Sequence, residues 1–335
     1  MMHPVPISPV NPAGSVRRRL LPGNAFAVLG FLLVSGVIVA VIAMAYVFVY
    51  LPDARLAAHL GKVAGATYTR SLPVVPLPTT PVPVVTPVSG ILLDVDSATV
   101  LWEKNALQPR PIASLTKLVS AVTWLNTNPK LDAYVTIPSD IDQAVAEAGE
   151  PGDVASKVSL QPGERVRAKD LLASAIIASA NNALLALVRS TGSVADFTQE
   201  MAQSAADAHT TTLTVADPTG LDRANVASAK DIALLAHQAF QNPVLKPFFT
   251  QAQTRITTAG GRTFTARSTD ELVRTTRTYT VVGAKTGYLP EAGYTFAVEA
   301  KKDDRKLVLV LLGEPNSAAR FADADALLQW GFSAT

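Results

Sequence analysis

The run from Asn24 to Leu51 sets the strongest limit on how this chain can fold, because it contains no charged side chain. A helix needs about 20 consecutive apolar residues to cross the hydrocarbon core of a bilayer, and this run is longer. Three arginines at 17–19 precede it, and arginines beside a span stay on the cytoplasmic side. The sequence therefore predicts a cytoplasmic tail over 1–23, a single-pass transmembrane anchor over 24–51 in the cell membrane, and an extracytoplasmic remainder.

A cleaved signal peptide is the alternative for this run. Ala43 and Ala45 form an A-x-A pattern, but the apolar residues continue past it, and the apolar part of a secretory signal is only about 7–15 residues long. A buried core helix is disfavoured by the length of the run and its lack of polar residues. We favour the uncleaved anchor.

Residues 52–88 are predicted to form a proline-rich linker. Six prolines fall between Ser71 and Gly90, and such segments prefer the extended polyproline II conformation. Because proline interrupts the hydrogen-bond ladders of sheets, a strand-rich interpretation of this segment is weak. We expect a semi-rigid spacer that lifts the following domain off the membrane.

The composition excludes several classes of site. The sequence contains no cysteine, so an exported domain must be held together by packing rather than by disulfides. It also has neither a thiol nucleophile nor a cysteine zinc site, and we expect no metal. The formal net charge is +2 with no basic stripe beyond the arginine triplet, so nucleic-acid binding has no support.

Residues 89–335 are predicted to form one catalytic domain of the α/β (α+β) class. Two short apolar runs begin it and read as a hairpin, three strand-like runs end it, and mainly helical patterns lie between them, with short strands at 134–137 and 157–160. The simplest packing is an antiparallel five-stranded sheet built from both ends of the domain, covered by helices, with a helical insert. The five strands are expected over 90–96, 98–105, 278–288, 292–300 and 306–314, and the last helix over roughly 317–330.

Ser114 and Lys117 are the first candidate catalytic residues. They stand three positions apart at a predicted helix start, so they share one face of that helix. A serine hydroxyl becomes a good nucleophile only when a base takes its proton, and lysine can be that base when burial or the positive end of a helix lowers its pKa. The competing interpretation is that Ser114 only caps the helix.

Two further segments add polar groups. Ser179 and Asn181 lie between two apolar helical runs, where they are either caps or a second hydroxyl and an amide of the site. Lys285, Thr286 and Gly287 end a β-branched run. We expect that run to be a strand edge on which an extended substrate pairs as an added strand, with Gly287 allowing close approach.

The order Ser-x-x-Lys, Ser-x-Asn, Lys-Thr-Gly is much rarer than any single motif and is that of penicillin-binding proteins and class A β-lactamases. Through "PIASLTKLVSAV", "IIASANNALLALV", "DPTGLD" and "GAKTGYLPEAGYTF", the chain resembles the serine D-alanyl-D-alanine carboxypeptidase family, the low-molecular-mass penicillin-binding proteins. The resemblance covers roughly residues 89–330. It implies the DD-peptidase/β-lactamase-like fold, a peptidoglycan stem peptide ending in D-Ala-D-Ala as substrate, β-lactams as covalent inhibitors, and no cofactor.

The resemblance also implies roles for the motif residues. Ser114 would attack the carbonyl between the two D-alanines, Lys117 would accept its proton, Ser179 would relay a proton to the leaving amine, and Asn181 would orient Lys117. The terminal carboxylate would be bound by Lys285 and Thr286, and the backbone N–H groups of Ser114 and Tyr288 would form the oxyanion hole.

The chain departs from the family pattern at three places. Ala180 stands where many members have glycine, and Tyr288 where some have histidine. The loop 266–273, "ARSTDELV", replaces an Asn-Thr-Asn-like loop, which puts one substrate contact of that loop in doubt.

Four other functions were weighed against the carboxypeptidase. A Ser-His-Asp hydrolase is disfavoured because no G-x-S-x-G elbow surrounds a serine. A β-lactamase would need a deacylating glutamate that neither Glu200 nor Glu271 supplies in its usual context. A D,D-endopeptidase that cleaves crosslinks and a sensor that acylates without turnover stay open as alternatives.

Overall fold

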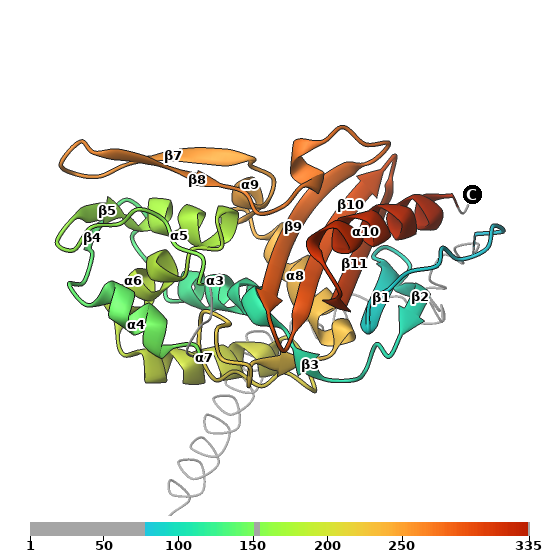
Figure 1. Cartoon of the computed structure of the whole chain (residues 1–335), viewed down its shortest axis with the longest axis horizontal. Helices are drawn as coiled ribbons and strands as arrows, with labels where there is room; N and C mark the ends of the chain where they lie inside the picture. Colours follow the sequence, from blue (N-terminus) through green and yellow to red (C-terminus); the bar gives the residue numbers. More distant parts are fainter. Residues whose placement is uncertain (1–77, 151–154, 334–335) are drawn as a thin grey trace, which may run out of the picture. The chain divides into compact units, whose positions relative to one another are not determined.

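The computed structural model describes residues 78–150 and 155–333 (Figure 1). The predicted tail, the predicted anchor and the first part of the predicted linker lie outside these ranges. Within the described ranges, no helix combines the length and the apolar character that a membrane crossing requires. The anchor of residues 24–51 therefore stays a prediction.

The predicted five-stranded antiparallel sheet from both ends of the domain is confirmed. Its strand order is β2-β1-β11-β10-β9, so that the two N-terminal strands pair beside the three C-terminal ones. The hydrogen-bonded neighbours β1 and β11 join the two ends, with Leu92 opposite Leu309. The strands are β1 (Ser89–Asp94), β2 (Thr99–Lys104), β9 (Thr280–Leu289), β10 (Gly293–Lys302) and β11 (Arg305–Glu314).

Both faces of this sheet are buried at β11, which explains the uninterrupted apolar run of that strand. Side chains alternate between the two faces of a strand. Leu307, Leu309 and Leu311 join one buried cluster with α10 (Ser317–Phe332), while the residues between them face α8 (Ala229–Gln241). Figure 1 shows α10 and α8 on opposite sides of the strands. Residues 307–312 are all 0% exposed.

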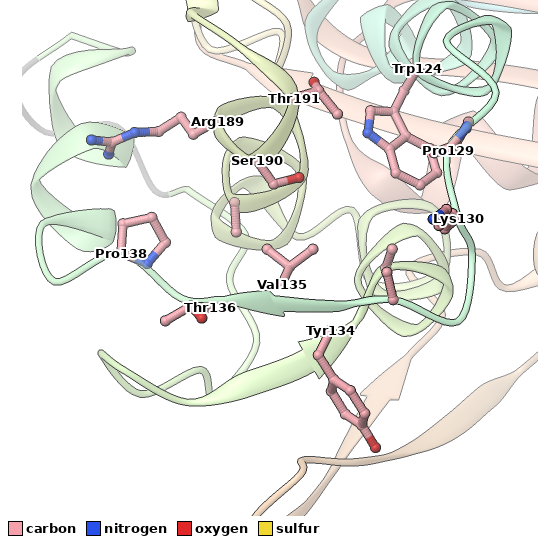
Figure 2. Close-up of a pocket in the computed structure, with 13 residues that line it drawn as sticks. Trp124, Pro129, Lys130, Tyr134, Val135, Thr136, Pro138, Arg189, Ser190 and Thr191 are labelled. Atoms are coloured by element: carbon pink, nitrogen blue, oxygen red, sulfur yellow. The ribbon is translucent and has the colours of Figure 1, made fainter.

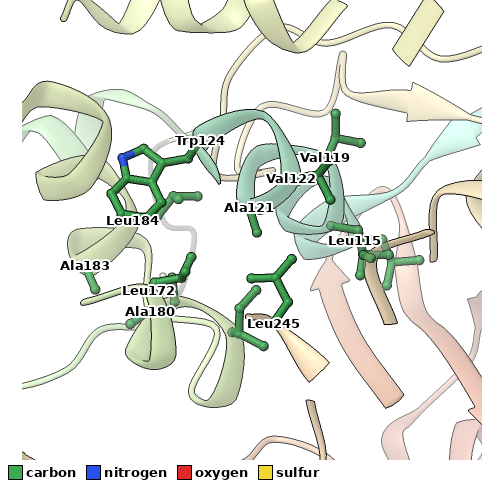
Figure 3. Close-up of a cluster of buried hydrophobic side chains, with 14 of the residues drawn as sticks. Leu115, Val119, Ala121, Val122, Trp124, Leu172, Ala180, Ala183, Leu184 and Leu245 are labelled. Atoms are coloured by element: carbon green, nitrogen blue, oxygen red, sulfur yellow. The ribbon is translucent and has the colours of Figure 1, made fainter. Parts of the chain in front are cut away.

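The helical insert stands beside the sheet and is organised around α3 (Thr116–Asn126). Trp124 of α3 lies beside Leu184 of a neighbouring helix (Figure 3), and Val119 of α3 and Leu115 directly before it belong to the same buried cluster. This burial fixes the start of α3 relative to its neighbours. The other helices of the insert are α4 (Ile141–Glu147), α5 (Ala168–Ile177), α6 (Asn181–Thr191), α7 (Val194–Asp207) and α9 (Lys246–Phe249).

Three short antiparallel pairs complete the described part of the domain. They are β3 (Arg110–Pro111) with β6 (Val226–Ala227), β4 (Tyr134–Thr136) with β5 (Arg165–Arg167), and β7 (Gln253–Thr257) with β8 (Thr263–Arg267). Two 3-10 helices, η1 (Ala113–Leu115) and η2 (Leu272–Arg274), lie beside β9.

The strand expected over 157–160 is wrong. The main chain of Val158 bonds instead to the side chain of Asn182, whose amide donates to Val158 O at 2.8 Å and accepts from Val158 N at 3.2 Å. A side-chain amide therefore takes the place of a neighbouring strand.

The described end of the proline-rich segment lies against the domain. The indole of Trp330 donates to Thr80 O at 2.9 Å, and Thr86 N donates to Asp323 Oδ2 at 2.7 Å. Both partners are on α10, so residues 80–88 follow that helix into β1.

Candidate active site

Ser114 lies in η1, directly before α3, as the sequence predicted for a helix start. Its side chain caps neither helix, because no side-chain cap bond forms at the N-terminus of η1 or of α3. Its Oγ lies 2.8 Å from Lys117 Nζ. The simple capping interpretation of Ser114 is therefore excluded, and the hydroxyl and the amine meet.

Lys117 is completely buried, at 0% exposure. Its Nζ also donates to Asn181 Oδ1 and to Thr219 O, each at 2.6 Å. Burial lowers the pKa of Lys117 to about 7, and the Asp217 carboxylate acts in the opposite direction. A neutral amine has two N–H groups and one lone pair, so its two hydrogens satisfy the two carbonyl oxygens and the lone pair is left for the Ser114 hydroxyl.

Ser179 lies in the turn between α5 and α6, and Asn181 is the first residue of α6. Ser179 Oγ accepts from Lys285 Nζ at 2.9 Å, and the same amine donates to Thr286 O at 2.8 Å. The pKa of Lys285 lies well below its usual range because the amine is buried and because Lys117 and Arg320 place positive charge nearby. The structure thus brings all three motifs into one chain of contacts.

The cleft side of β9 is the edge of the sheet, which leaves a row of backbone groups free to pair. Gly287 lies on this edge beside the nucleophile. A Cβ atom there would stand 2.4 Å from Thr295 Oγ1 and 3.0 Å from Ser114 N. Only glycine lets the strand come this close to the start of α3.

Two residues of the site hold a strained backbone. Ala113 has φ 49° and Ser179 has φ 56°, both in the left-handed region that side chains other than glycine rarely adopt. Gly220, with φ 80°, packs against Ala113 so closely that a Cβ would stand 2.1 Å from Ala113 O. Such strain persists only where surrounding contacts enforce it, and it clusters at functional sites.

The cleft above Ser114 has a volume of about 200 Å³. Its lining includes Thr286, Gly287 and the half-exposed Tyr288, together with residues that the sequence did not single out. Neither Lys117 nor Lys285 is among the lining residues. The full lining is Ser114, Ser156, Ser179, Asn181, Gly220, Leu221, Thr269, Thr286, Gly287, Tyr288, Tyr294 and Arg320.

Arg320 is the main functional candidate that the sequence missed. It lies on α10, is 5% exposed, and donates to Gly287 O at 3.1 Å. Its guanidinium lies 5.3 Å from the ring centroid of Tyr294 and 4.5 Å from that of Phe321. Burial lowers the pKa of Arg320 to about 10, with the Asp270 carboxylate acting in the opposite direction, so the guanidinium is charged at neutral pH.

The loop 266–273, which lacks the sequence usual in the family, reaches the cleft through Thr269. Thr269 lines the cleft and its Oγ1 shares a hydrogen bond with Thr286 Oγ1. In the next position Asp270 is buried, and burial raises its pKa to about 6. No motif in the sequence signals either residue, because threonine and aspartate are common in loops.

The described residues contain no group of three or more His, Asp or Glu side chains arranged to hold a metal. What the arrangement can do chemically is acyl transfer. A nucleophilic hydroxyl and a second hydroxyl line one cleft beside a strand edge for the substrate. Each hydroxyl contacts a buried amine with a lowered pKa, and these are the groups that acyl transfer needs.

A family model described as D-alanyl-D-alanine carboxypeptidase, of the S11 peptidases, matches residues 78–316. Among curated proteins, the chain is 28% identical over 248 residues to the D-alanyl-D-alanine carboxypeptidase DacF of Bacillus subtilis, covering 73% of this chain and 62% of the relative. It is also 28% identical to a D-alanyl-D-alanine endopeptidase of Pseudomonas aeruginosa, covering 72% of this chain and 76% of the relative.

Solved structures of D-alanyl-D-alanine peptidases share the fold of this chain. The Streptomyces K15 DD-transpeptidase superimposes with a TM-score of 0.70 at 25% identity, covering 76% of this chain and 100% of that one. A D-alanyl-D-alanine carboxypeptidase from Mycobacterium tuberculosis superimposes with a TM-score of 0.68 at 24% identity, covering 77% of this chain and 96% of that one.

Proposed function

The chain belongs to the D-alanyl-D-alanine carboxypeptidase family of serine peptidases, and we propose that Ser114 forms the acyl-enzyme through which it trims the terminal D-alanine from peptidoglycan stem peptides. The observation that carries this proposal is the Lys117 amine, buried and 2.8 Å from Ser114 Oγ. Because the pKa of this amine is about 7, about half of the molecules carry a neutral Lys117 at pH 7, and the neutral amine is available as a base.

The first half of the reaction forms the ester. Lys117 takes the hydroxyl proton, and Ser114 Oγ attacks the carbonyl carbon between the two D-alanines. The tetrahedral intermediate collapses when its C–N bond breaks and the leaving amine receives a proton, which passes from Lys117 by way of the Ser179 hydroxyl. Water then attacks the ester and releases the shortened peptide, so this sequence requires no cofactor.

The negative oxygen of the tetrahedral intermediate needs donors. We place it at the backbone N–H groups of Ser114 and Tyr288, on either side of Gly287. The closeness of Gly287 to Ser114 N supports this placement. Loss of one such donor typically lowers the rate by about 10²–10³-fold. The substrate backbone would pair along the β9 edge.

We place the terminal carboxylate of the substrate against Thr286 and Arg320. Both line the cleft, and Arg320 is charged at neutral pH. Lys285 was assigned to this carboxylate from the motif, and its lowered pKa favours a second role in orienting Ser179. Charge-assisted hydrogen bonds to a carboxylate are about twice as strong as neutral ones. A charged Arg320 would therefore bind the substrate carboxylate more strongly than a neutral Lys285.

The first test is covalent labelling. A fluorescent penicillin, which acts as a covalent β-lactam inhibitor, should label the protein, and Ser114→Ala should abolish the label. Equal labelling of the variant would remove Ser114 as the nucleophile.

The second test separates the activities. A D,D-endopeptidase is the specific alternative, because two of the most similar relatives carry that name. Incubation with a stem pentapeptide and with a crosslinked dimer, each followed by mass spectrometry, distinguishes them. Released D-alanine means carboxypeptidase, separated dimers mean endopeptidase, and acylation without either product means a sensor.

Membrane attachment is part of the same proposal and rests on residues 17–51 alone. The uncharged run and the arginines before it support a single-pass anchor with the N-terminus in the cytoplasm and the catalytic domain outside. The protein should stay with the membrane fraction after a high-salt wash, and recovery in the soluble fraction would favour a cleaved segment.

A further inference from the structure

The hairpin β7–β8 continues the lining of the catalytic cleft outward. Its ladder extends past Arg267, because Ser268 N donates to Ala252 O at 2.8 Å. More and less exposed side chains alternate along β8 and on to Thr269, so Arg267 and Thr269 share the outer face of the strand. Thr269 lines the cleft and bonds to Thr286. The outer face of the hairpin therefore begins at the cleft.

The hairpin is held at both ends and along its inner face. At its base, Thr269 N donates to Ile177 O at 3.3 Å, two residues before Ser179. At its tip, Ala259 N donates to Arg165 O of β5 at 2.8 Å. The apolar side chains of the inner face are buried, and Figure 1 shows the pair lying over α5. These contacts fix the outer face relative to the cleft.

The strand that holds the tip is itself fixed in the domain. β5 pairs with β4, and Figure 2 shows Val135 of β4 facing a cavity beside Trp124, whereas Tyr134 points to the other side. The guanidinium of Arg165 lies 5.1 Å from the ring centroid of Tyr134. The end of the hairpin remote from the cleft therefore rests on an anchored strand that carries a further cation.

Two arginines on the outer face have no acidic partner. Arg255 stands opposite Thr265, so it is the diagonal neighbour of Arg267 on the same face, at a distance of about 7–8 Å. Both side chains are exposed, and among the described residues neither guanidinium has an ion pair, a hydrogen bond or a ring contact. Arg262 of the same hairpin, by contrast, is paired with Glu164. A guanidinium matches the geometry of a carboxylate, so two unpaired ones on a fixed face favour a carboxylate ligand.

This face lies on the leaving-group side of the cleft. The base of the hairpin contacts Thr286, where we place the carboxylate next to the cleaved bond, and it bonds two residues before Ser179, where we place proton transfer to the leaving amine. A single D-alanine ends at Thr286 and does not extend to Arg267, because outward residues along a strand are about 6.8 Å apart. Residues 263–269 span about 20 Å, enough to accompany an extended pentapeptide of about 17 Å.

We propose that Arg267 and Arg255 bind a carboxylate of a second stem peptide when the chain cleaves a crosslink, which makes crosslinked peptides a substrate class of this site. The inference rests on the proposed function, because it uses the same acyl-enzyme on Ser114. The bond that breaks is the amide between D-alanine and the amine of the second peptide. Ser114 Oγ takes the acyl group, the amine leaves with the proton relayed by Ser179, and water then hydrolyses the ester. The two arginines exchange no atom with the substrate and act on specificity.

The test measures kcat/KM of the full chain on a stem pentapeptide and on a crosslinked dimer. The double variant Arg255→Gln/Arg267→Gln should cleave the dimer about 3- to 20-fold less efficiently, through a higher KM, and the pentapeptide as well as the wild type does. A second dimer is amidated at every carboxylate of the leaving peptide except one next to the cleaved bond. The wild type should lose a similar factor on this dimer, and the double variant should lose nothing further.

The matched control removes two exposed cations elsewhere. Lys301→Gln/Lys302→Gln changes the end of β10 remote from Tyr294 and should leave both rates unchanged. The inference is overturned by a wild type that leaves the dimer intact, by an unchanged dimer rate in the arginine variant, or by equal losses on the pentapeptide or in the lysine variant. A chain that cleaves the dimer through these arginines but releases no D-alanine from the pentapeptide instead overturns the carboxypeptidase activity and leaves the inference standing.

Discussion

Replacing Asn181 by aspartate should move the pH dependence of acylation without dismantling the cleft. Asn181 Oδ1 lies 2.6 Å from Lys117 Nζ, and a carboxylate at that distance raises the pKa of an amine by about 1–3 units. The pKa of Lys117 would then rise from about 7 to about 8–10. The neutral fraction of the amine at pH 7 falls accordingly, and acylation should slow by roughly 5- to 500-fold.

The assay is the second-order rate constant for labelling by a fluorescent penicillin between pH 5 and pH 10. In the wild type this constant should rise about tenfold per pH unit below pH 7 and level off above it. In Asn181→Asp the rise should occur 1–3 units higher, and the two curves should converge at the alkaline end. Asn181→Leu, which removes the amide without adding charge, is the control. A variant curve that is lower at every pH but has an unmoved midpoint would refute Lys117 as the titrating base.

Three more changes test other parts of the site. Gly287→Ala places a methyl group between Thr295 and the Ser114 N–H, so penicillin labelling should fall by about 10²-fold or more, while circular dichroism keeps the wild-type spectrum. Lys117→Met removes a buried amine whose low pKa destabilises the fold below pH 10.5, but it also leaves Asn181 Oδ1 and Thr219 O without their donor. The lost bonds offset part of the roughly 4 kcal/mol from the pKa shift, so the variant should gain roughly 1–3 kcal/mol in urea unfolding at pH 7, and the gain should shrink as the pH approaches 10.5. Arg320→Gln should slow cleavage of a peptide with a free terminal carboxylate by about tenfold or more, yet leave a C-terminally amidated peptide unaffected; equal losses on both would exclude the carboxylate role.

The sheet was predictable because its signals are local. Each strand of the large sheet carries an apolar run bounded by turn residues, and both ends of the domain show them. The pair β7–β8 escaped prediction because its strands, "QTRIT" and "TFTAR", are polar on the outer face, with only Ile256, Phe264 and Ala266 buried. Likewise, nothing in the sequence of residues 157–160 reveals that a side-chain amide serves as their partner.

The site was predictable where its residues belong to short motifs with a fixed internal spacing. Ser114, Lys117 and Asn181 could be assigned to one site because the order of the motifs is rare. Arg320 could not, because a single arginine in an apolar helix looks like an exposed residue until the sheet and α10 are packed together. Thr219 was hidden for a different reason: its contribution is a backbone carbonyl, which every residue possesses.

The energetics explain why such a site needs a large sheet beside it. A pKa lowered from 10.5 to about 7 corresponds to about 4 kcal/mol of destabilisation at pH 7, which approaches the whole stability of some domains. Residues 307–312 of β11 are six apolar side chains at 0% exposure, each stabilising the fold by about 1.5–3 kcal/mol. The buried sheet is thus among the parts of the fold that offset the cost of the buried amine, although β11 does not contain the catalytic residues. A substitution that loosens β11 should lower the unfolding temperature long before it changes the rate at which Ser114 is acylated.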